Sequence, residues 1–283
     1  MNKDIYIGID GGGSKCAIRV EDADGTLLAE AQAGPANISM SFEQAWDSIR
    51  HACYLAQIDF TREDLNVHAG MGLAGTEDVT AVQAFLDYLH PFDSIVLKSD
   101  AHIACKGAHA GEDGAIIISG TGIIGYAMQD AEEVTVSGWG FALHDVGSGA
   151  WLGYEAIRCM LKWRDQRCRS TPLLEALFER IGDDIVGFAR RANATSYAEF
   201  AKVVFEYSED PVAKHLFHIA AKEIETIYET LCKSRFQFPL CLHGSIAQHL
   251  MPYLSIGFIN HLVPVEGDAL EGAMSLIREE VCV

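Results

Sequence analysis

The stretch IYIGIDGGGSKCAIRV, residues 5–20, decides the fold, because it combines an apolar strand, a turn rich in Gly and Ser, and a second strand. The stretch AIIISGTGIIGYAM, residues 115–128, repeats this design farther along the chain. Gly tolerates φ > 0 and lets the backbone approach a ligand closely, so each turn can direct several N–H groups at phosphate oxygens. The repeat therefore predicts two related half-domains that hold the two ends of a triphosphate. It favours phosphoryl transfer or nucleotide hydrolysis as the class of function.

Length and composition limit the class further. At 283 residues the chain is long for one core and sufficient for two domains, and its 49% hydrophobic residues can bury both. The formal net charge of −19 argues against a nucleic-acid partner, because surfaces that bind nucleic acid are basic. We expect small-molecule partners. An anionic nucleotide would then be held by backbone N–H groups, helix N-termini and a divalent cation.

The eight cysteines are scattered without a C-x-x-C pair, and several lie in apolar periodic stretches. We therefore expect buried, reduced thiols. The apolar runs fall short of the roughly 18 residues of a membrane span. The first of them ends at Asp10, too soon for a signal peptide. These features favour a soluble cytoplasmic protein with no membrane partner.

The first half alternates strands and helices in the manner of an α/β domain. We expect strands at residues 5–9, 16–20, 26–32, 66–71 and 94–98. A Ser41/Gln44 capping box starts the first expected helix. The apolar face of the second is formed by Val79, Val82, Phe85, Leu86 and Leu89. Three strands before the first helix distinguish this pattern from the βαβ opening of a dinucleotide-binding fold.

The second half repeats the opening and then becomes mostly helical. A third strand is expected near residues 133–137 and a further one at 238–242. Helices are expected at residues 148–163, 172–181, 197–207 after a Ser196/Glu199 capping box, 211–233, from 244, and 268–279. We place the domain boundary near Ser119, which gives domains of residues 1–118 and 119–283.

The first turn consists of Asp10, Gly11, Gly12, Gly13, Ser14 and Lys15. A plain hairpin needs only one or two Gly residues, whereas three follow a strand that ends in a carboxylate, so we interpret the turn as a phosphate site. Asp10 would then hold Mg²⁺ through water, and Ser14 and Lys15 would face the outer phosphates. The Gly-Lys-Ser/Thr ending of a Walker A loop is missing.

The second turn consists of Ser119, Gly120, Thr121 and Gly122. With Gly125 it matches G-x-G-x-x-G, but a dinucleotide fingerprint must open a helix, and residues 123–128 have the pattern of a strand. A dehydrogenase is therefore disfavoured.

Three further positions carry a functional and a plain alternative. Asp100 ends an apolar strand, where it is either a general base or a helix N-cap. Asp145, between His144 and a Gly-Ser-Gly run, suits sugar hydroxyls, or the loop is only a cap with Ser148 as N-cap. Gly244 and Ser245 link a strand to a helix, either under a nucleoside or as an ordinary turn. His144 and His243 have no second metal ligand at a suitable spacing and are interpreted as structural.

Taken together, these strings resemble the sugar-kinase branch of the actin, hexokinase and heat-shock ATPase superfamily, in particular N-acetylglucosamine kinases and bacterial glucosamine kinases of the BadF/BcrA type. The resemblance covers nearly the whole chain. It is carried, in order, by IGIDGGGSKC, GPANI, GLAG, KSDAHIACKGAHAGEDGAIIISGTG, HDVGSGAWLG, CLHGSIA and DALEGAM.

The resemblance implies an α/β protein with two ribonuclease H-like, actin-like ATPase domains around a nucleotide and sugar cleft, the second with a helical insertion. It makes residues 10–15 the phosphate-1 motif, residues 119–122 the phosphate-2 motif, and Gly244 and Ser245 the adenosine motif. Asp100 would be the base toward the sugar 6-hydroxyl. The residues placed at the sugar are Asn37, Gly75, Asp100, Thr121 and Asp145. The implied reaction is ATP- and Mg²⁺-dependent phosphorylation of glucosamine, with N-acetylglucosamine as the alternative acceptor. A more distant alternative is an ATPase module without a sugar acceptor. The resemblance also implies a possible homodimer.

The chain also departs from these families. Val146 stands where N-acetylglucosamine kinases often carry a second acidic residue. The cysteine-rich zinc motif of the ROK kinases is missing from the sequence. The scattered thiols do not match the paired cysteines with which reductase activators hold an iron–sulfur cluster.

Overall fold

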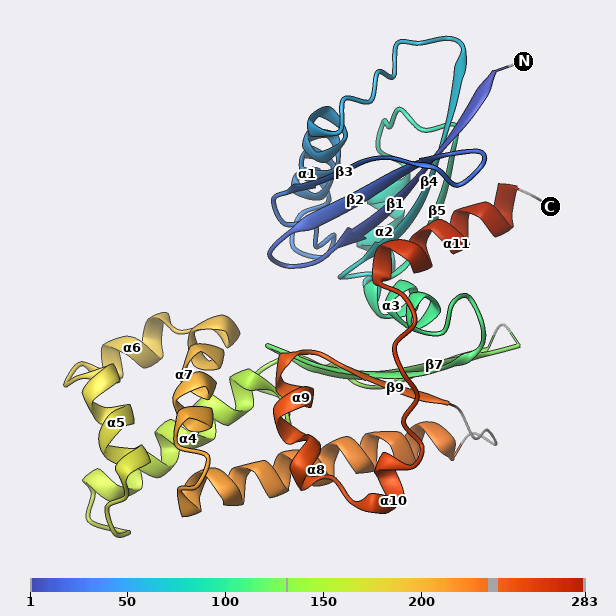
Figure 1. Cartoon of the computed structure of the whole chain (residues 1–283). Coiled ribbons are helices and arrows are strands. Elements are labelled where there is room, and N and C mark those ends of the chain that lie inside the picture. Colours follow the sequence, from blue (N-terminus) through green and yellow to red (C-terminus); the bar gives the residue numbers. More distant parts are fainter. Residues whose placement is uncertain (1, 131, 234–238, 282–283) are drawn as a thin grey trace. The chain divides into compact units, whose positions relative to one another are not determined.

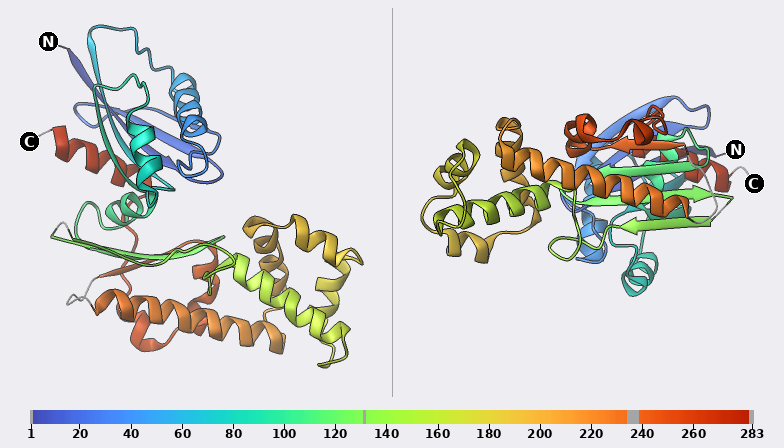
Figure 2. Two further views of the ribbon diagram at one scale, coloured as in Figure 1. Left: turned by 180° about the vertical axis from the view of Figure 1, so that it is seen from behind. Right: turned by 90° about the horizontal axis from the view of Figure 1, so that it is seen from below.

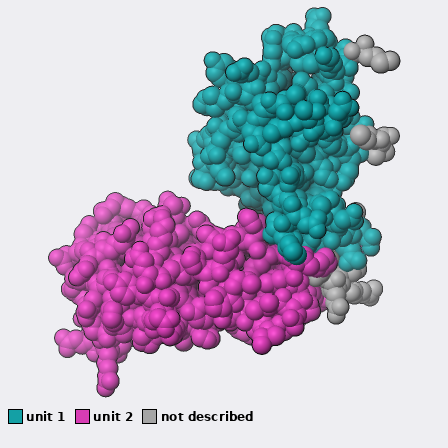
Figure 3. Space-filling view, in the orientation of Figure 1, with its two compact units in different colours: residues 1–114, 128–131, 264–283 teal, residues 115–127, 132–263 magenta. Residues whose placement is uncertain are grey.

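The computed structural model describes residues 2–130, 132–233 and 239–281. Its contacts divide the chain into two compact units (Figure 3). Unit 1 comprises residues 1–114, 128–131 and 264–283, and unit 2 comprises residues 115–127 and 132–263. A single boundary near Ser119 would assign the C-terminal segment to the second domain, whereas its contacts place it in unit 1.

Unit 1 is built on a five-stranded sheet with the order β3-β2-β1-β4-β5 (Figure 1). Its strands are β1 (Lys3–Gly11), β2 (Cys16–Asp22), β3 (Leu27–Ala33), β4 (Leu65–Leu73) and β5 (Ser94–Ser99). The first three form an antiparallel meander, and β4 and β5 run parallel to β1. All five strands were predicted from the sequence, with ends that differ by up to two residues.

Helices cover both faces of this sheet, α1 (Phe42–Leu55) on one face and α3 (Asp100–Ala108) with α11 (Ala269–Val281) on the other (Figures 1 and 2). The alternation of side chains along β1 explains the two layers. Ile7 and Ile9 join the core that α1 completes, whereas Tyr6 joins the core with Met274 of α11. The C-terminal helix is therefore an integral layer of unit 1.

Helix α2 (Val79–Leu86) is shorter than its apolar pattern predicted. Asp78 caps it by accepting hydrogen bonds from two backbone N–H groups, and the helix ends before Leu89. Phe85 is buried, but Val79 is 79% exposed and Leu89 is 84% exposed. The expected apolar face was therefore wrong at both ends.

The second sheet has the order β8-β7-β6-β9. Its strands are β6 (Gly114–Ser119), β7 (Ile123–Gln129), β8 (Glu132–Ser137) and β9 (Leu240–His243), and β9 runs parallel to β6. This order repeats β3-β2-β1-β4 of the first sheet strand by strand, which confirms the two related halves. Residue 238 of the expected last strand lies outside the described residues.

Unit 2 also carries most of the helices. They are α4 (Gly149–Arg164), α5 (Pro172–Ile181), α6 (Ile185–Arg191), α7 (Ala194–Glu206), α8 (Pro211–Cys232), α9 (Ser245–Leu250), the 3-10 turn η1 (Met251–Tyr253) and α10 (Ile256–Ile259). Ser148 caps α4, as one reading of the sequence expected. The expected Ser196/Glu199 capping box is wrong, because Asn193 and Ser196 form the box and α7 begins at Ala194.

The thiols are mostly but not uniformly buried. Burial raises the pKa of both Cys16 and Cys53 to about 12, so these thiols stay protonated. Cys168 is exposed, which corrects the expectation of general burial, and Cys282 lies outside the described residues. Among the helices of the described chain, none has the length and apolar character needed to span a membrane.

Candidate active site

The carboxyl ends of three parallel strands bring Asp10 and Asp100 to one edge of the unit 1 sheet. Asp10 on β1 is in register with Gly72 on β4, and the next residue of β4, Leu73, is in register with Ser99 at the end of β5. Asp100 follows directly as the first residue of α3. Ligands of open α/β sheets bind at this kind of edge. The structure therefore assembles the two acids that the sequence singled out.

The pKa values of both carboxyl groups are raised above the ordinary value of aspartate. Burial raises the pKa of Asp10, and the negative charge of Asp100 raises it further, against the opposing charge of Lys15. Burial likewise raises the pKa of Asp100, with the charge of Glu77 adding to it and the backbone N–H of Ala101 opposing it. A divalent cation would relieve this crowding of negative charge. The pair therefore fits a Mg²⁺ ion that is bound through one carboxylate and substrate phosphates.

The N-cap alternative for Asp100 does not hold in the structure. Ser99 is the N-cap of α3, and its Oγ accepts a hydrogen bond of 3.1 Å from the backbone N–H of His102. Asp100 takes the next position, where its Oδ1 accepts from the N–H of Ala101 at 2.8 Å. Since the serine performs the capping, the second carboxylate oxygen of Asp100 remains an acceptor for a ligand.

In the first Gly-rich turn, lack of space for a side chain explains Gly11. Gly11, Gly12 and Gly13 are not among the residues with positive φ, which corrects the reason given for them from the sequence. A Cβ on Gly11 would lie 2.5 Å from Cδ2 of Leu73, whereas one on Gly12 or Gly13 would meet nothing within 4 Å. The backbone above these two glycines is therefore open to a ligand.

One backbone donor of this turn is already used. The N–H of Gly12 donates to the carbonyl of Lys15 at 2.9 Å and closes the turn. Ser14 and Lys15 are exposed at its tip, where a hydroxyl and an ammonium can meet an anion.

Asn37 and Gly75, which the resemblance places at the sugar, lie against each other in unit 1. The side-chain Oδ1 of Asn37 accepts hydrogen bonds from the N–H groups of Ser39 and Met40, at 3.0 and 3.2 Å. Gly75 has a φ of 92°, and a Cβ there would lie 2.7 Å from the same oxygen. The glycine thus lets the loop after β4 lie against Asn37. Because Oδ1 is occupied, the amide NH₂ of Asn37 is the group left for a sugar hydroxyl.

In unit 2 the second Gly-rich turn is tied to the start of α4. The N–H of Gly120 donates to Gly122 at 2.9 Å, and the carbonyls of Gly120 and Thr121 accept from Gly149 at 2.8 Å and Ala150 at 3.1 Å. Ser119 is fully buried, and its Oγ donates to the carbonyl of Gly147 at 2.7 Å. A Cβ on Gly120 would meet nothing within 4 Å. The turn is therefore held rigidly while its outer surface stays open.

Asp145 lies directly beside this turn, since a Cβ on Gly122 would lie 3.3 Å from its Oδ2. The residue is only 6% exposed. Burial raises the pKa of Asp145, while His144 and the backbone N–H groups of Ile123 and Gly140 oppose the shift. His144 itself contacts Glu223, with Nε2 and Oε1 3.9 Å apart, in keeping with a structural role.

Gly244 and Ser245 start α9, and Gly244 is required there. Its φ is 102°, and a Cβ would lie 2.7 Å from the carbonyl carbon of Ser119 and closer still to the oxygen. Ser245 lines a cavity of about 280 Å³ that the second Gly-rich turn also borders. Its other wall is α7, which the sequence did not connect with any site. The residues that the sequence missed are Gly149, Thr195, Ala198, Glu199, Ala201, Lys202, Phe205, Ile246 and His249.

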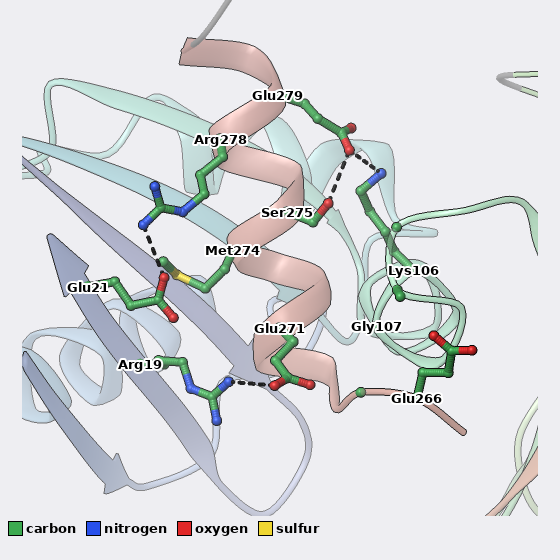
Figure 4. Close-up of a pocket in the computed structure, with 13 residues that line it drawn as sticks. Arg19, Glu21, Lys106, Gly107, Glu266, Glu271, Met274, Ser275, Arg278 and Glu279 are labelled. Carbon is green, nitrogen blue, oxygen red and sulfur yellow. Dashed lines mark hydrogen bonds and ion pairs between the residues drawn. The ribbon is translucent and has the colours of Figure 1, made fainter. Parts of the chain in front are cut away.

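A larger cavity of about 730 Å³ in unit 1 does not coincide with these residues (Figure 4). It lies between β2, α3 and α11, and most of its charged side chains pair with one another. Lys106 meets Glu279 at 2.9 Å, and Arg278 meets Glu21 at 3.0 Å. None of the predicted site residues lines it. Within the described part of the chain, moreover, no group of three His, Cys, Asp or Glu residues is placed to hold a metal ion.

Comparison with known proteins assigns the chain to a family. The model of the BadF/BadG/BcrA/BcrD ATPase family matches residues 7–257. Glucosamine kinase GspK of Vibrio cholerae is 36% identical over 277 residues, which cover 95% of this chain and 94% of that protein. The N-acetylmuramic acid/N-acetylglucosamine kinase of Clostridium acetobutylicum is 27% identical over 300 residues, with 97% and 98% coverage.

A solved structure shows the same fold. It is that of a Chromobacterium violaceum protein proposed to be an N-acetylglucosamine kinase, with a TM-score of 0.88 and 30% identity over 96% of this chain and 98% of that one. The fold is therefore the two-domain α/β fold of the actin-like sugar kinases, as expected.

Proposed function

The chain belongs to the BadF/BadG/BcrA/BcrD ATPase family, and we propose that it is an ATP:hexosamine 6-phosphotransferase that converts glucosamine to glucosamine 6-phosphate. The similarity to glucosamine kinase GspK over 95% of the chain supports glucosamine as the acceptor. N-acetylglucosamine is the alternative, supported by the second curated relative. The observation that carries the proposal is the position of Asp100. It is partly buried, does not serve as the N-cap of α3, and lies at the carboxyl edge of a sheet that also presents a Gly-rich turn.

In this proposal unit 1 binds the sugar and supplies the base. Asp100 accepts the proton of the 6-hydroxyl as its oxygen attacks the γ-phosphorus of ATP, and the bond to the bridging oxygen breaks to release ADP. The amide of Asn37 and the loop at Gly75 orient the sugar. The phosphates lie against the turn of Gly11, Gly12 and Gly13, whose backbone is open at Gly12 and Gly13, with Ser14 and Lys15 as further donors. Positioning and charge neutralisation supply most of the rate in such transfers.

Unit 2 supplies the remaining contacts of the proposal. Ser119, Gly120, Thr121 and Gly122 form the second phosphate turn, and the open face of Gly120 suits close approach of an anion. Asp145, beside this turn, accepts hydrogen bonds from sugar hydroxyls together with Thr121. Gly244 and Ser245 lie under the adenosine.

We also infer that ATP enters with Mg²⁺, which neutralises phosphate charge when bound. Asp10 fits as its protein ligand through water, because a cation beside it offsets the charge of Asp100. A homodimer and a cytoplasmic location stay predictions.

Replacement of Asp100 tests the proposal. Asp100→Asn keeps the shape and removes the base, so we expect turnover to fall by about 10²–10⁴-fold while ATP and sugar still bind. Asp24→Asn, at an exposed turn of unit 1, is the matched control and should leave turnover unchanged. Near-normal turnover of Asp100→Asn would contradict the assignment.

An acceptor panel separates the alternatives. ADP release is measured with glucosamine, N-acetylglucosamine, glucose, N-acetylmannosamine and no acceptor. A glucosamine kinase gives the largest kcat/KM with the first sugar and little release without one. Acceptor-independent hydrolysis would instead indicate an ATPase module.

A further inference from the structure

The loop that follows β4 carries an acid with no assigned part in the proposed reaction, Glu77. Leu73, the last residue of β4, is in register with Ser99 at the end of β5, and Asp100 follows Ser99 directly. The loop therefore begins at the same carboxyl edge of the sheet as the proposed base. Glu77 lies four residues beyond Leu73.

Backbone hydrogen bonds fix this loop between two segments of the proposed site. The N–H of Ala74 donates to the carbonyl of Gly11 at 2.8 Å, and the carbonyl of Ala74 accepts from the N–H of Ile38 at 2.9 Å. Gly11 belongs to the first Gly-rich turn, and Ile38 follows Asn37. The next residue of the loop, Gly75, is the one that lies against Asn37. The loop is therefore part of the wall on which the sugar is proposed to lie.

A tight turn presents Glu77 near its tip. The N–H of Asp78 donates to the carbonyl of Gly75 at 3.3 Å, which makes Glu77 the third residue of a β-turn. The neighbouring acid is committed to α2, because Oδ1 of Asp78 accepts from two backbone N–H groups of that helix at 2.9 and 3.1 Å. Glu77 is exposed and, within the described part of the chain, forms no ion pair or side-chain hydrogen bond. Its carboxylate is therefore free to bind a ligand.

The charge of Glu77 reaches the proposed base. It adds to burial in raising the pKa of Asp100, and since the two side chains share no hydrogen bond, they act on each other through charge alone. The 6-hydroxyl and the 2-amine of a hexosamine lie on opposite sides of its ring. A hexosamine whose 6-hydroxyl meets Asp100 therefore needs a second acid at a distance from Asp100, and not in contact with it, to meet its amine.

The group at C2 is what distinguishes the candidate acceptors. The protonated amine of glucosamine carries a positive charge and offers three donors. The acetamide of N-acetylglucosamine and the hydroxyl of glucose are neutral and offer one donor each. A carboxylate forms stronger, charge-assisted hydrogen bonds with an ammonium than with a neutral donor. A free carboxylate beside C2 therefore selects glucosamine over both neutral sugars.

We propose that Glu77 binds the 2-ammonium group of glucosamine while Asp100 meets the 6-hydroxyl, which makes Glu77 the residue that sets the preference for a free amino sugar. The other acids at this edge have other parts, Asp10 toward Mg²⁺ and Asp78 as the cap of α2. The inference rests on the proposed kinase function and names the residue that selects its acceptor.

The test compares glucosamine, glucose and N-acetylglucosamine as acceptors at neutral pH. The wild type should use glucosamine with a kcat/KM about 10-fold or more above that for glucose, as expected for a hydrogen bond between charged groups. Glu77→Gln keeps the shape and removes the charge, so kcat/KM for glucosamine should fall by a similar factor while the value for glucose and the KM for ATP stay unchanged. Glu63→Gln is the matched control, because it is exposed and precedes the opposite end of β4, and it should behave as the wild type. Since Glu77 is exposed, the melting temperature of Glu77→Gln should equal that of the wild type.

Binding of glucosamine and glucose by calorimetry, without ATP, separates the role of Glu77 from the proposed function. A wild type that binds glucosamine but transfers no phosphate to it would overturn the kinase function, and a weaker affinity of Glu77→Gln for glucosamine alone would still support the role of Glu77. Retention of the full preference for glucosamine over glucose in Glu77→Gln would overturn that role and leave the kinase intact. A wild type that does not distinguish the two sugars, or that prefers N-acetylglucosamine, would overturn it as well.

Discussion

Replacement of Gly244 by Ala tests how the strand-to-helix turn of unit 2 is built. Gly244 has φ 102° and ψ 157°, a region that is nearly confined to Gly and costs other residues about 1–3 kcal/mol. The added Cβ would also lie 2.7 Å from the carbonyl carbon of Ser119, a backbone atom that cannot rotate away. Overpacking of this kind costs about 1–3 kcal/mol. Together the two effects predict a loss of at least about 2 kcal/mol, which lowers the melting temperature of a unit of this size by at least about 4 °C.

Thermal denaturation followed by circular dichroism measures this loss, and Gly120→Ala is the matched control. Gly120 has no positive φ, and a Cβ there would meet nothing within 4 Å, so its melting temperature should equal that of the wild type. The new methyl group instead occupies the space proposed for phosphate, and kcat/KM for ATP should fall by about 10-fold or more, as when a hydrogen bond to a charged group is lost. A melting temperature of Gly244→Ala equal to that of the wild type would refute the reasoning.

Much of the fold could be predicted because its signals are local. The five strands of unit 1 have apolar runs, and the pleat alternates Tyr6 and Ile7 between two cores. The repeated Gly-rich hairpin predicted the duplication, and the order β3-β2-β1-β4 recurs as β8-β7-β6-β9. The carboxyl edge that carries Asp10 and Asp100 followed from the ends of two strands.

What could not be predicted depends on distant contacts. Helix α11 joins unit 1 because Gly8 and Gly70 leave room on the sheet, where a Cβ on Gly8 would lie 2.8 Å from the carbonyl oxygen of Leu270. Nothing near residue 269 signals that partner. The wall of the unit 2 cavity was missed for a similar reason, since Glu199 matched a local capping pattern that Asn193 pre-empts.

The two acids of unit 1 predict how pH acts on activity and on stability. Burial raises the pKa of Asp100, so kcat/KM for the sugar should fall as the pH drops through a value above the ordinary aspartate range, and a flat profile down to about pH 4 would contradict its role as base. The raised pKa of Asp10 means that its ionised form disfavours the folded state, so its contribution to stability is present below the unfolded pKa and is lost as pH rises through the folded pKa. Asp10→Asn should therefore increase the free energy of unfolding at pH 7 while activity falls. In urea titrations this gain in the free energy of unfolding should shrink toward acidic pH, because wild-type Asp10 is then protonated. A lower free energy of unfolding for Asp10→Asn at pH 7 would show that ionised Asp10 does not destabilise the folded state.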